Sequence, residues 1–371
     1  MKILEITNVD FSLTHFLLPL MRALREDGHD VVGVCAEGPL LAQPRAEGFR
    51  VEALPFARSF SPLAQARAFL ALVRLIRREK PDLVHAHMPI SGVLARLAAK
   101  LCGVPRIAYT CHGFLFNQPG SHARRILALV LEKLCGHVTD IFLTVSQEEA
   151  EDARRLHIHP HPIAIGNGRD STRFRPDDAA RARIRREVGT SEHTPVIIVV
   201  SRLVRHKGYP ELLEAMRAVP QAELWVVGER LPSDHGSVLD TCFEQARIAL
   251  GPRLKCLGYR TDIPALLAAA DIFTLPSHFE GLPMSIIEAM LTELPVVSTD
   301  IRGPREQVVQ NVTGLLVPPA NATRLAEALR ILTQNAALRA QMGTAARARA
   351  LALFDERVVL TRTVRLLTET A

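Results

Sequence analysis

The chain has 371 residues, of which 48% are hydrophobic and 23% are charged, values typical of a globular protein with about two domains. Its formal net charge is +6, without a long run of Lys or Arg, which fits an anionic substrate or an anionic membrane surface and gives no support for nucleic acid as a partner. Aromatic residues make up only 5%, with a single tryptophan, so a base-stacking surface for single strands is disfavoured.

The N-terminus, MKILEIT, predicts a short strand rather than a secretory signal, and no window reaches the roughly 18 apolar residues of a membrane span. The six cysteines form no C-x-x-C pair and have apolar neighbours, which predicts buried, reduced thiols and no zinc site. We therefore expect a cytoplasmic protein, and we consider peripheral contact with the cytoplasmic face of the inner membrane.

In the first half of the chain, strand signals alternate with helix signals. The strand signals lie at 2–7, 29–36, 50–54, 82–87, 106–112 and 140–146, and the helix signals at 15–27, 62–79, 90–102 and 124–135. This alternation is typical of βαβ units, in which helices cover both faces of a parallel sheet.

A charged segment without a strand, residues 168–192, interrupts this pattern, and a second series then begins. Its strand signals lie at 195–201, 222–228, 253–259, 271–277, 295–300 and 314–319, and its helix signals near 211–218, 239–249, 265–269, 283–291 and from 322 onward. We predict an α/β protein with two Rossmann-like, doubly wound parallel-sheet domains. The first comprises residues 1–170 with a C-terminal helix at about 355–371, and the second comprises residues 171–354.

The strongest motif is HFEGLPMSIIEAM, which places Glu280 in the loop after one strand and Glu288 in the helix that follows. Pro283 suits the first position of that helix, whose free N–H groups form an anion site. Two carboxylates beside an anion site are compatible if the carboxylates accept hydrogen bonds from hydroxyls while the amides hold phosphate. A sugar nucleotide has both groups. For either glutamate alone, a helix-start charge or a solvated residue is an equally good interpretation.

The second motif is VVSRLVRHKG, which places Arg202 and Lys207 in the loop after another strand. Both can neutralise a diphosphate leaving group if they point into one cleft. We expect Arg205 and His206 to be solvated loop charges.

Together these strings resemble retaining glycosyltransferase family 4, whose members have the GT-B fold, in which two Rossmann-like domains face each other across a cleft. The resemblance covers nearly the whole chain and rests on SRLVRHKGYPELLEA, LGYRTDIPALLAAADIFTLPSHFEGLPMSIIEAML, LPVVSTDIRGPREQV and TGLLVPP. It is closest to the subgroup that extends lipid-linked glycans for capsule, O-antigen or protein glycosylation. The resemblance implies a sugar-nucleotide donor and a polyprenyl-diphosphate-linked saccharide acceptor.

The resemblance also assigns roles to residues of the second domain. It implies that Arg202 and Lys207 bind the donor diphosphate, that Glu280 contacts the donor sugar and that Glu288 bonds the ribose hydroxyls. Backbone groups from Gly281 to Ser285 would complete the cradle, Tyr259 would abut the base, and Gly228 would lie beside the nucleotide. The cradle residues are Gly281, Leu282, Pro283, Met284 and Ser285. The loop at 229–237 is longer than usual for the family.

In the first domain, YTCHGF places His112 just after a strand, where the family has a histidine that faces the transferred sugar; a single histidine is otherwise most often structural. The first loop, NVDFSLTHFLLP, lacks the glycine pair that many members carry, so donor contacts there would fall to Ser12 or Thr14. We interpret Gly166 and Gly168 as hinge glycines.

The chain contains no D-x-D triplet of the kind that holds a divalent ion against a diphosphate. Because Arg202, Lys207 and a helix N-terminus can supply the charge, we expect no metal and no cofactor. Two segments are candidates for the acceptor side: 57–80, which carries six basic residues, and GFLFNQPG at 113–120, which places Phe114 and Phe116 in a loop. For 57–80 we favour a core-facing helix with a solvated face over contact with anionic lipid.

The predicted activity is transfer of a hexose or N-acetylhexosamine from a nucleotide sugar, with UDP favoured over GDP. The resemblance implies retention of anomeric configuration. The alternatives are a UDP-sugar epimerase or hydrolase on the same fold and a catalytically silent sugar-nucleotide-binding protein. A nicotinamide dehydrogenase fits poorly, because no G-x-G-x-x-G follows the first strand.

Overall fold

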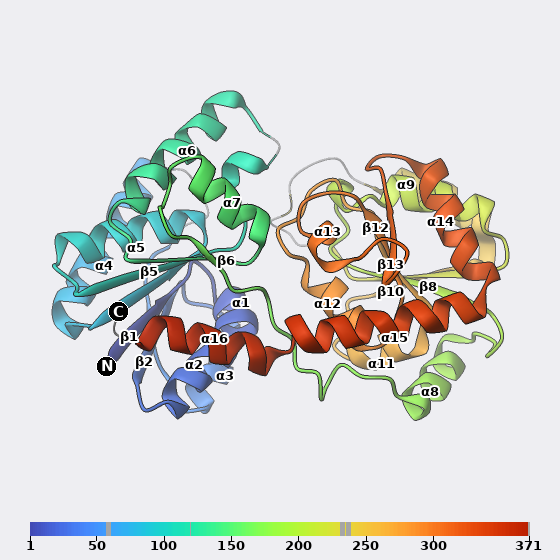
Figure 1. Cartoon of the computed structure of the whole chain (residues 1–371), viewed down its shortest axis with the longest axis horizontal. Helices are drawn as coiled ribbons and strands as arrows, with labels where there is room; N and C mark the ends of the chain where they lie inside the picture. The colour runs from blue at the N-terminus through green and yellow to red at the C-terminus, as the bar shows by residue number, and fades with distance from the viewer. Residues whose placement is uncertain (57–60, 119, 231–233, 235–238, 370–371) are drawn as a thin grey trace. The chain divides into compact units, whose positions relative to one another are not determined.

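The computed structural model describes residues 1–56, 61–118, 120–230, 234 and 239–369. The chain divides into two compact units, one of Met1–Gly166 with Val359–Ala371 and one of Asn167–Val358 (Figure 1). The bounds proposed from the sequence, 170 and 354, lie close to these divisions. Each unit is built on its own parallel sheet, as the alternation of strand and helix signals predicted.

The first unit has a seven-stranded sheet in the order β3-β2-β1-β4-β5-β6-β7, in which all neighbours are parallel. The order reverses between β1 and β4, which makes that pair the switch point of the sheet. The strands are β1 Lys2–Ile6, β2 Asp30–Cys35, β3 Arg50–Ala53, β4 Leu83–His87, β5 Arg106–Cys111, β6 Ile141–Thr144 and β7 Ile163–Ala164. The helices are α1 Asp10–Ser12, α2 Leu18–Glu26, α3 Ala42–Ala46, α4 Pro62–Glu79, α5 Pro89–Leu101, α6 His122–Gly136, α7 Gln147–Arg155 and α16 Glu356–Thr368.

Both faces of this sheet are buried, because successive side chains of a strand point to opposite sides. Leu4, Val84 and Tyr109 pack on one face against α4, α5 and α6. Ile3 and Leu83 pack on the other face against α2 and α16. Figure 1 shows the two helical layers on either side of the sheet.

The second unit has a six-stranded parallel sheet in the order β10-β9-β8-β11-β12-β13, with its switch point between β8 and β11. The strands are β8 Val196–Val200, β9 Glu223–Val227, β10 Leu254–Gly258, β11 Ile272–Leu275, β12 Val296–Thr299 and β13 Gly314–Val317. The helices are α8 Asp178–Val188, α9 Tyr209–Ala215, α10 Asp240–Leu250, α11 Ile263–Ala269, α12 Met284–Leu291, α13 Pro304–Gln307, α14 Ala322–Gln334 and α15 Ala336–Leu353.

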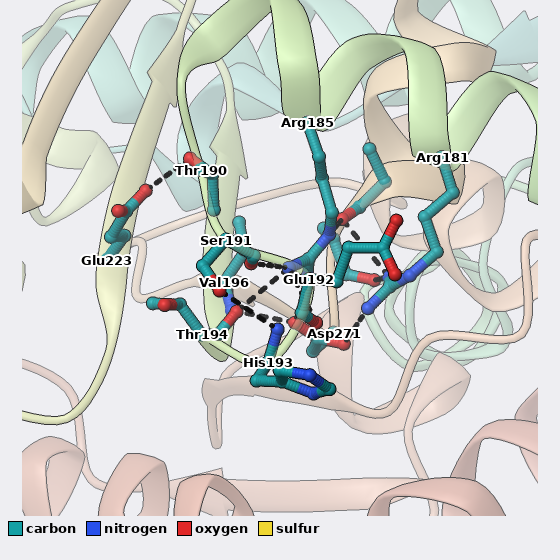
Figure 2. Close-up of polar contacts among 12 residues, drawn as sticks. Arg181, Arg185, Thr190, Ser191, Glu192, His193, Thr194, Val196, Glu223 and Asp271 are labelled. Atoms are coloured by element: carbon teal, nitrogen blue, oxygen red, sulfur yellow. Dashed lines mark hydrogen bonds and ion pairs between the residues drawn. The ribbon is translucent and has the colours of Figure 1, made fainter.

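A buried arginine fixes α8 to the amino ends of β8 and β11 (Figure 2). Arg185 is 1% exposed, and it donates to Asp271 at 2.6 Å and to the carbonyls of Ser191 and Thr194 at 2.7 and 3.0 Å. Asp271 also accepts from the Val196 amide at 2.7 Å. Because the charge is fully paired, its burial costs far less than that of an isolated ion. The Arg185–Asp271 contact therefore fixes the amino ends of β8 and β11. The loops that contain the two sequence motifs follow the carboxyl ends of the same two strands.

Three local predictions need correction. The first loop is helical from Asp10, because apolar side chains such as Leu13 and Leu17 pack into the core there. Helix α12 begins at Met284, so Pro283 is its N-cap residue, with an extended ψ of 124°. Cys256 is exposed, whereas we expected buried thiols; all six cysteines are free.

The acceptor-side predictions have mixed outcomes. Phe114 and Phe116 are buried in the core beneath α6, where their ring centroids stack 4.6 Å apart, so these two rings do not form an exposed apolar surface for the acceptor. In α4, five apolar residues are buried, but Leu63 and Leu70 are exposed. The prediction of a core-facing helix is thus confirmed for some of the apolar residues of α4 and not for others. Residues 57–60 of the predicted segment lie outside the described residues. No helix in the described ranges is long and apolar enough to cross a bilayer.

Candidate active site

The two motif loops begin at neighbouring strand ends in the second unit. Residues 201–208 follow β8, and residues 276–283 follow β11, which pairs with β8. Ligands of open α/β sheets bind outside the carboxyl ends of the strands at the switch point. The topology therefore brings both motifs to the edge where that rule places a ligand.

Direct contacts join the two loops. The His278 amide donates to the His206 carbonyl at 2.8 Å, and the His206 and Phe279 rings stack with centroids 4.5 Å apart. Gly208 has φ +78° and approaches Pro276 so closely that a Cβ would lie 1.9 Å from the Pro276 carbonyl oxygen. Only glycine fits there, and this close approach brings the end of the basic loop against the acidic one.

Lys207 and Glu280 meet at this junction. The Lys207 Nζ lies 2.6 Å from the Glu280 Oε1, and the Ser277 hydroxyl donates to the same oxygen at 2.6 Å. The two side chains are 15% and 10% exposed. The pair therefore places one cation and one anion in a partly desolvated position at the switch point, where each charge acts more strongly than in water.

Arg202 lies at the same strand end and is 48% exposed. Its guanidinium donates to the carboxylate of Asp234. Asp234 belongs to the long loop at 229–237, most of which lies outside the described residues.

His206 is not the solvated charge that the sequence suggested. Burial, followed by the positive charges of Lys207 and Arg202, lowers the pKa of His206 to about 4. The ring is therefore neutral at neutral pH and stacks on Phe279, while Arg205 is exposed as expected.

The first turn of α12 lies directly after the acidic loop. Among the described residues no side chain caps this turn, so the amides of Met284 and Ser285 have no intrahelical or capping partner. Leu282 and Pro283 are buried, while Gly281, Met284 and Ser285 are half-buried. Asn167 and Gln307 hold the turn in place by donating to the carbonyls of Leu282 and Pro283 at 2.8 and 2.9 Å.

Glu288 is buried on α12 and accepts from the Arg169 Nε at 2.7 Å. Burial raises the pKa of Glu288, although Arg169 opposes the shift. Sequence reasoning missed Arg169. The only signal in the sequence was its place next to Gly168, which we had interpreted as a hinge glycine.

Gly228 and Tyr259 directly follow the neighbouring strands β9 and β10. Gly228 has φ +131°, and a Cβ there would lie 2.0 Å from the Ser201 carbonyl oxygen, so this position requires glycine. Its amide donates to the Gly258 carbonyl at 2.8 Å. Tyr259 is 63% exposed, which leaves its ring accessible at the same edge of the sheet.

In the first unit, His112 follows β5 and is half-buried. Its Nε2 lies 3.1 Å from the Nδ1 of His87, which in turn contacts Glu5. Neither Glu5 nor His87 was singled out from the sequence, although the alternation in VHAH is visible. Ser12 and Thr14 are both buried, and the Thr14 hydroxyl already donates to the Leu40 carbonyl at 3.1 Å.

Comparison with known proteins is consistent with this geometry. A model described as Glycosyl transferase 4-like domain matches residues 13–168, and one described as Glycosyl transferases group 1 matches residues 180–349. The chain is 30% identical over 319 residues to D-inositol 3-phosphate glycosyltransferase of Corynebacterium glutamicum, covering 80% of this chain and 73% of that protein.

Two further proteins are similar. The Escherichia coli UDP-Gal:alpha-D-GlcNAc-diphosphoundecaprenol alpha-1,3-galactosyltransferase is 29% identical over 305 residues, covering 79% of this chain and 77% of that protein. The crystal structure of Anabaena Alr3699/HepE in complex with UDP and glucose superposes with a TM-score of 0.83 at 22% identity, covering 100% of this chain and 99% of that one.

The two Rossmann-like sheets and the superposition define a glycosyltransferase of the GT-B fold. The chain belongs to the family 4 glycosyltransferases, whose two characteristic domains it carries in order.

Proposed function

We propose that this glycosyltransferase moves a hexose or N-acetylhexosamine from a UDP-sugar to a polyprenyl-diphosphate-linked saccharide, with retention of anomeric configuration. The observation that carries the proposal is the Lys207–Glu280 pair beside the uncapped first turn of α12. The UDP complex of Anabaena Alr3699/HepE and the diphosphoundecaprenol acceptor in the name of the E. coli relative support the donor and acceptor classes.

In this proposal the charges of the second unit bind the donor. Lys207, Arg202 and the amides of Met284 and Ser285 hold the diphosphate, since cations and helix N-termini stabilise phosphate. The diphosphate competes with Glu280 for Lys207, which frees the Glu280 carboxylate to accept hydrogen bonds from the sugar.

The remaining donor contacts follow from the same edge of the sheet. Glu288 accepts from the ribose hydroxyls, and Arg169 orients it. Tyr259 and Gly228 lie on the base side. We further propose that His112 contacts the transferred sugar.

The reaction breaks the bond between the anomeric carbon and the phosphate oxygen. The acceptor hydroxyl oxygen bonds to that carbon on the same face, and its proton goes to an oxygen of the departing diphosphate. Lys207 and Arg202 stabilise the negative charge that develops on the leaving group. Because these groups supply the charge, the proposal requires no metal.

The proposal is tested by incubating the protein with UDP- and GDP-sugars in the presence of EDTA, with and without lipid-linked saccharides. We expect UDP release only when an acceptor is present, and a product mass increased by one sugar. Rapid release of free sugar without acceptor would favour a hydrolase, and conversion of the donor to its epimer would favour an epimerase. Binding of UDP without turnover on any acceptor would favour the silent binding protein.

We also propose that the enzyme binds the cytoplasmic face of the membrane peripherally, through the outer face of α4, α5 and α6. These helices cover the same side of the first sheet (Figure 1). Their exposed apolar side chains are Leu63, Leu70, Leu97, Leu101, Ile126, Leu127, Val130 and Leu134.

The charges on this face are complementary to anionic lipid. Arg67, Arg74 and Lys100 are exposed on α4 and α5. The only acidic residues within these three fully described helices, Glu79 and Glu132, are buried and paired with arginines. Apolar side chains with exclusively basic exposed charge are typical of a surface that lies on a membrane.

Vesicle sedimentation tests this surface. The variant L127E/L134E should bind vesicles rich in anionic phospholipid at least about tenfold less than wild type, because two side chains lose their apolar burial. Ile248→Glu, at an 88% exposed position in the second unit, is the matched control and should bind normally. Unchanged binding by L127E/L134E, or equal wild-type binding to neutral vesicles, would overturn the membrane proposal.

A further inference from the structure

A row of polar side chains crosses the switch point of the first sheet. Glu5 on β1 pairs in register with His85 on β4, and His87 on β4 pairs with Thr110 on β5. His85 and His87 are two residues apart, as are Thr110 and His112. Since residues two apart on a strand face the same side, the four strand residues lie on one face, and His112, just after β5, contacts His87.

This face is otherwise part of the hydrophobic core, since Ile3, Leu83 and Ala108 precede the polar residues on the same three strands. Glu5 and His85 are fully buried, and His87 is 2% exposed. A carboxylate in this position is tolerated only if donors satisfy it. Its partners therefore determine where the protons of the row reside.

The contacts form a continuous chain. Glu5 Oε1 lies 3.0 Å from the His85 Nδ1, and Glu5 Oε2 lies 2.8 Å from the His87 Nε2. His85 Nε2 lies 2.8 Å from the Thr110 hydroxyl, which ends one branch. His87 Nδ1 lies 3.1 Å from the His112 Nε2, so the other branch ends at His112.

Elementary proton counting fixes the second branch. A carboxylate only accepts, so the His87 proton lies on Nε2, and a neutral imidazole has just one N–H. His87 Nδ1 is then an acceptor, and the proton it accepts must come from the His112 Nε2. His112 in turn has a bare Nδ1, and no described residue hydrogen-bonds this atom.

We propose that Glu5 and His87 are positioning residues that hold His112 as its neutral Nε2–H tautomer, so that its Nδ1 accepts a hydrogen bond from a hydroxyl of the bound sugar. The sugar contact rests on the proposed function, whereas the tautomer does not. A histidine fixed in this way discriminates for a donor hydroxyl and against a hydrogen-bond acceptor at the same position of the substrate.

The protonation states agree with this arrangement. Burial would raise the pKa of Glu5, but the charge and hydrogen bond of His85 and the contact with His87 outweigh it and lower the pKa to about 2. Burial, with the neighbouring histidines, lowers the pKa of His87 to about 4 and that of His112 to about 3. Near neutral pH the carboxylate is charged and both rings are neutral.

A metal ion is the competing occupant, since Glu5, His85 and His87 offer three ligand atoms within 4.8 Å of one another. Metal bound at the His87 Nε2 would move the His87 proton to Nδ1, which would then donate to His112. His112 would consequently carry its own proton on Nδ1. The two occupants therefore predict opposite tautomers of His112.

Long-range proton–nitrogen NMR of the full chain, labelled with ¹⁵N-histidine, measures the tautomer of each histidine directly at neutral pH. The set of signals that is lost in His112→Asn belongs to His112. We expect a protonated Nε2 and a bare Nδ1, unchanged by EDTA. A protonated Nδ1, or a tautomer that inverts when EDTA is added, would overturn the proposal.

Two variants separate positioning from general damage to the core. In His87→Leu no side-chain acceptor remains at this position for His112, while Glu5 keeps its contact with His85, so the His112 signals should move to a mixture of tautomers. Thr110→Val perturbs the branch that runs through His85 and ends at Thr110, and it should leave the tautomer of His112 unchanged. Equal effects of both variants would indicate a merely structural row.

Kinetics then connect the row to turnover. Glu5→Gln should lower kcat/KM about tenfold in the wild-type background and less than twofold in His112→Ala, because the effect passes through His112. Equal losses in the two backgrounds would overturn the positioning role. A different result would be full turnover by His112→Ala together with the expected tautomer in the wild type. It would show that His112 does not contact the sugar, and the tautomer assignment would still hold.

Discussion

Replacing Lys207 by methionine separates the two roles that the structure gives this residue. The substitution keeps the length of the side chain and removes its charge. It leaves the Glu280 carboxylate, whose side chain is 10% exposed, with the Ser277 hydroxyl as its single hydrogen-bond donor among the described residues. Because breaking a partly buried ion pair strands the remaining charge, we expect a loss of about 1–3 kcal/mol in the free energy of unfolding.

The loss of activity should be larger than the loss of stability explains. Without the cation beside the departing diphosphate, kcat should fall about a hundredfold or more, or roughly 2.7 kcal/mol of transition-state stabilisation. Urea denaturation measures the first effect, and UDP release at saturating donor and acceptor measures the second.

The double variant K207M/E280Q tests whether the effects are distinct. Removing both charges eliminates the stranded carboxylate, so stability should recover to within about 1 kcal/mol of wild type while turnover stays low. Near-normal turnover in Lys207→Met, or recovery of activity together with stability in the double variant, would refute the assignment.

Two other predictions concern stability and the donor site. The pKa values of His87 and His112 are lowered to about 4 and 3 in the folded protein. Below about pH 6.5 the unfolded chain therefore binds more protons than the folded one. The free energy of unfolding should fall from pH 6.5 towards pH 4 by up to about 1.4 kcal/mol per pH unit for each ring. Urea denaturation at several pH values checks this, and a curve that is flat over that range would contradict it. Gly228→Ala should cost about 1–3 kcal/mol and weaken UDP binding in calorimetry, since its Cβ would meet the Ser201 carbonyl at 2.0 Å; wild-type binding would argue against a donor site beside β9.

Much of the fold was predictable because its signals are local. Apolar runs bounded by turn residues gave the strands of both sheets, and the motif loops fell at strand ends because βαβ connections place them there. Within the candidate site, the position of Glu280 in the loop after β11 and the approximate start of α12 were predictable, because one short string carries both signals.

What the sequence could not give depends on tertiary contacts. Arg169 reaches Glu288 across 119 positions of the chain, and no local pattern pairs them. Phe114 and Phe116 lie in a segment that the sequence suggested as an acceptor-side loop, but their rings stack in the core beneath α6. From the sequence His206 looks like a charged loop residue, but in the structure its ring stacks on Phe279, and burial lowers its pKa to about 4.

The polar row of the first unit shows the same limit. The alternation in VHAH predicts that two histidines share a face, but Glu5 lies 80 residues earlier, and only the strand order brings β1 beside β4. A residue whose partner is fixed by topology is recognised only once the order of the strands is known.

A crystal structure of the protein with UDP would test the central claim most directly. The account predicts the diphosphate within hydrogen-bond distance of the Lys207 Nζ and of the Met284 and Ser285 amides, with the Lys207–Glu280 contact broken or shared. A diphosphate bound away from the carboxyl ends of β8 and β11, with that ion pair intact, would contradict it.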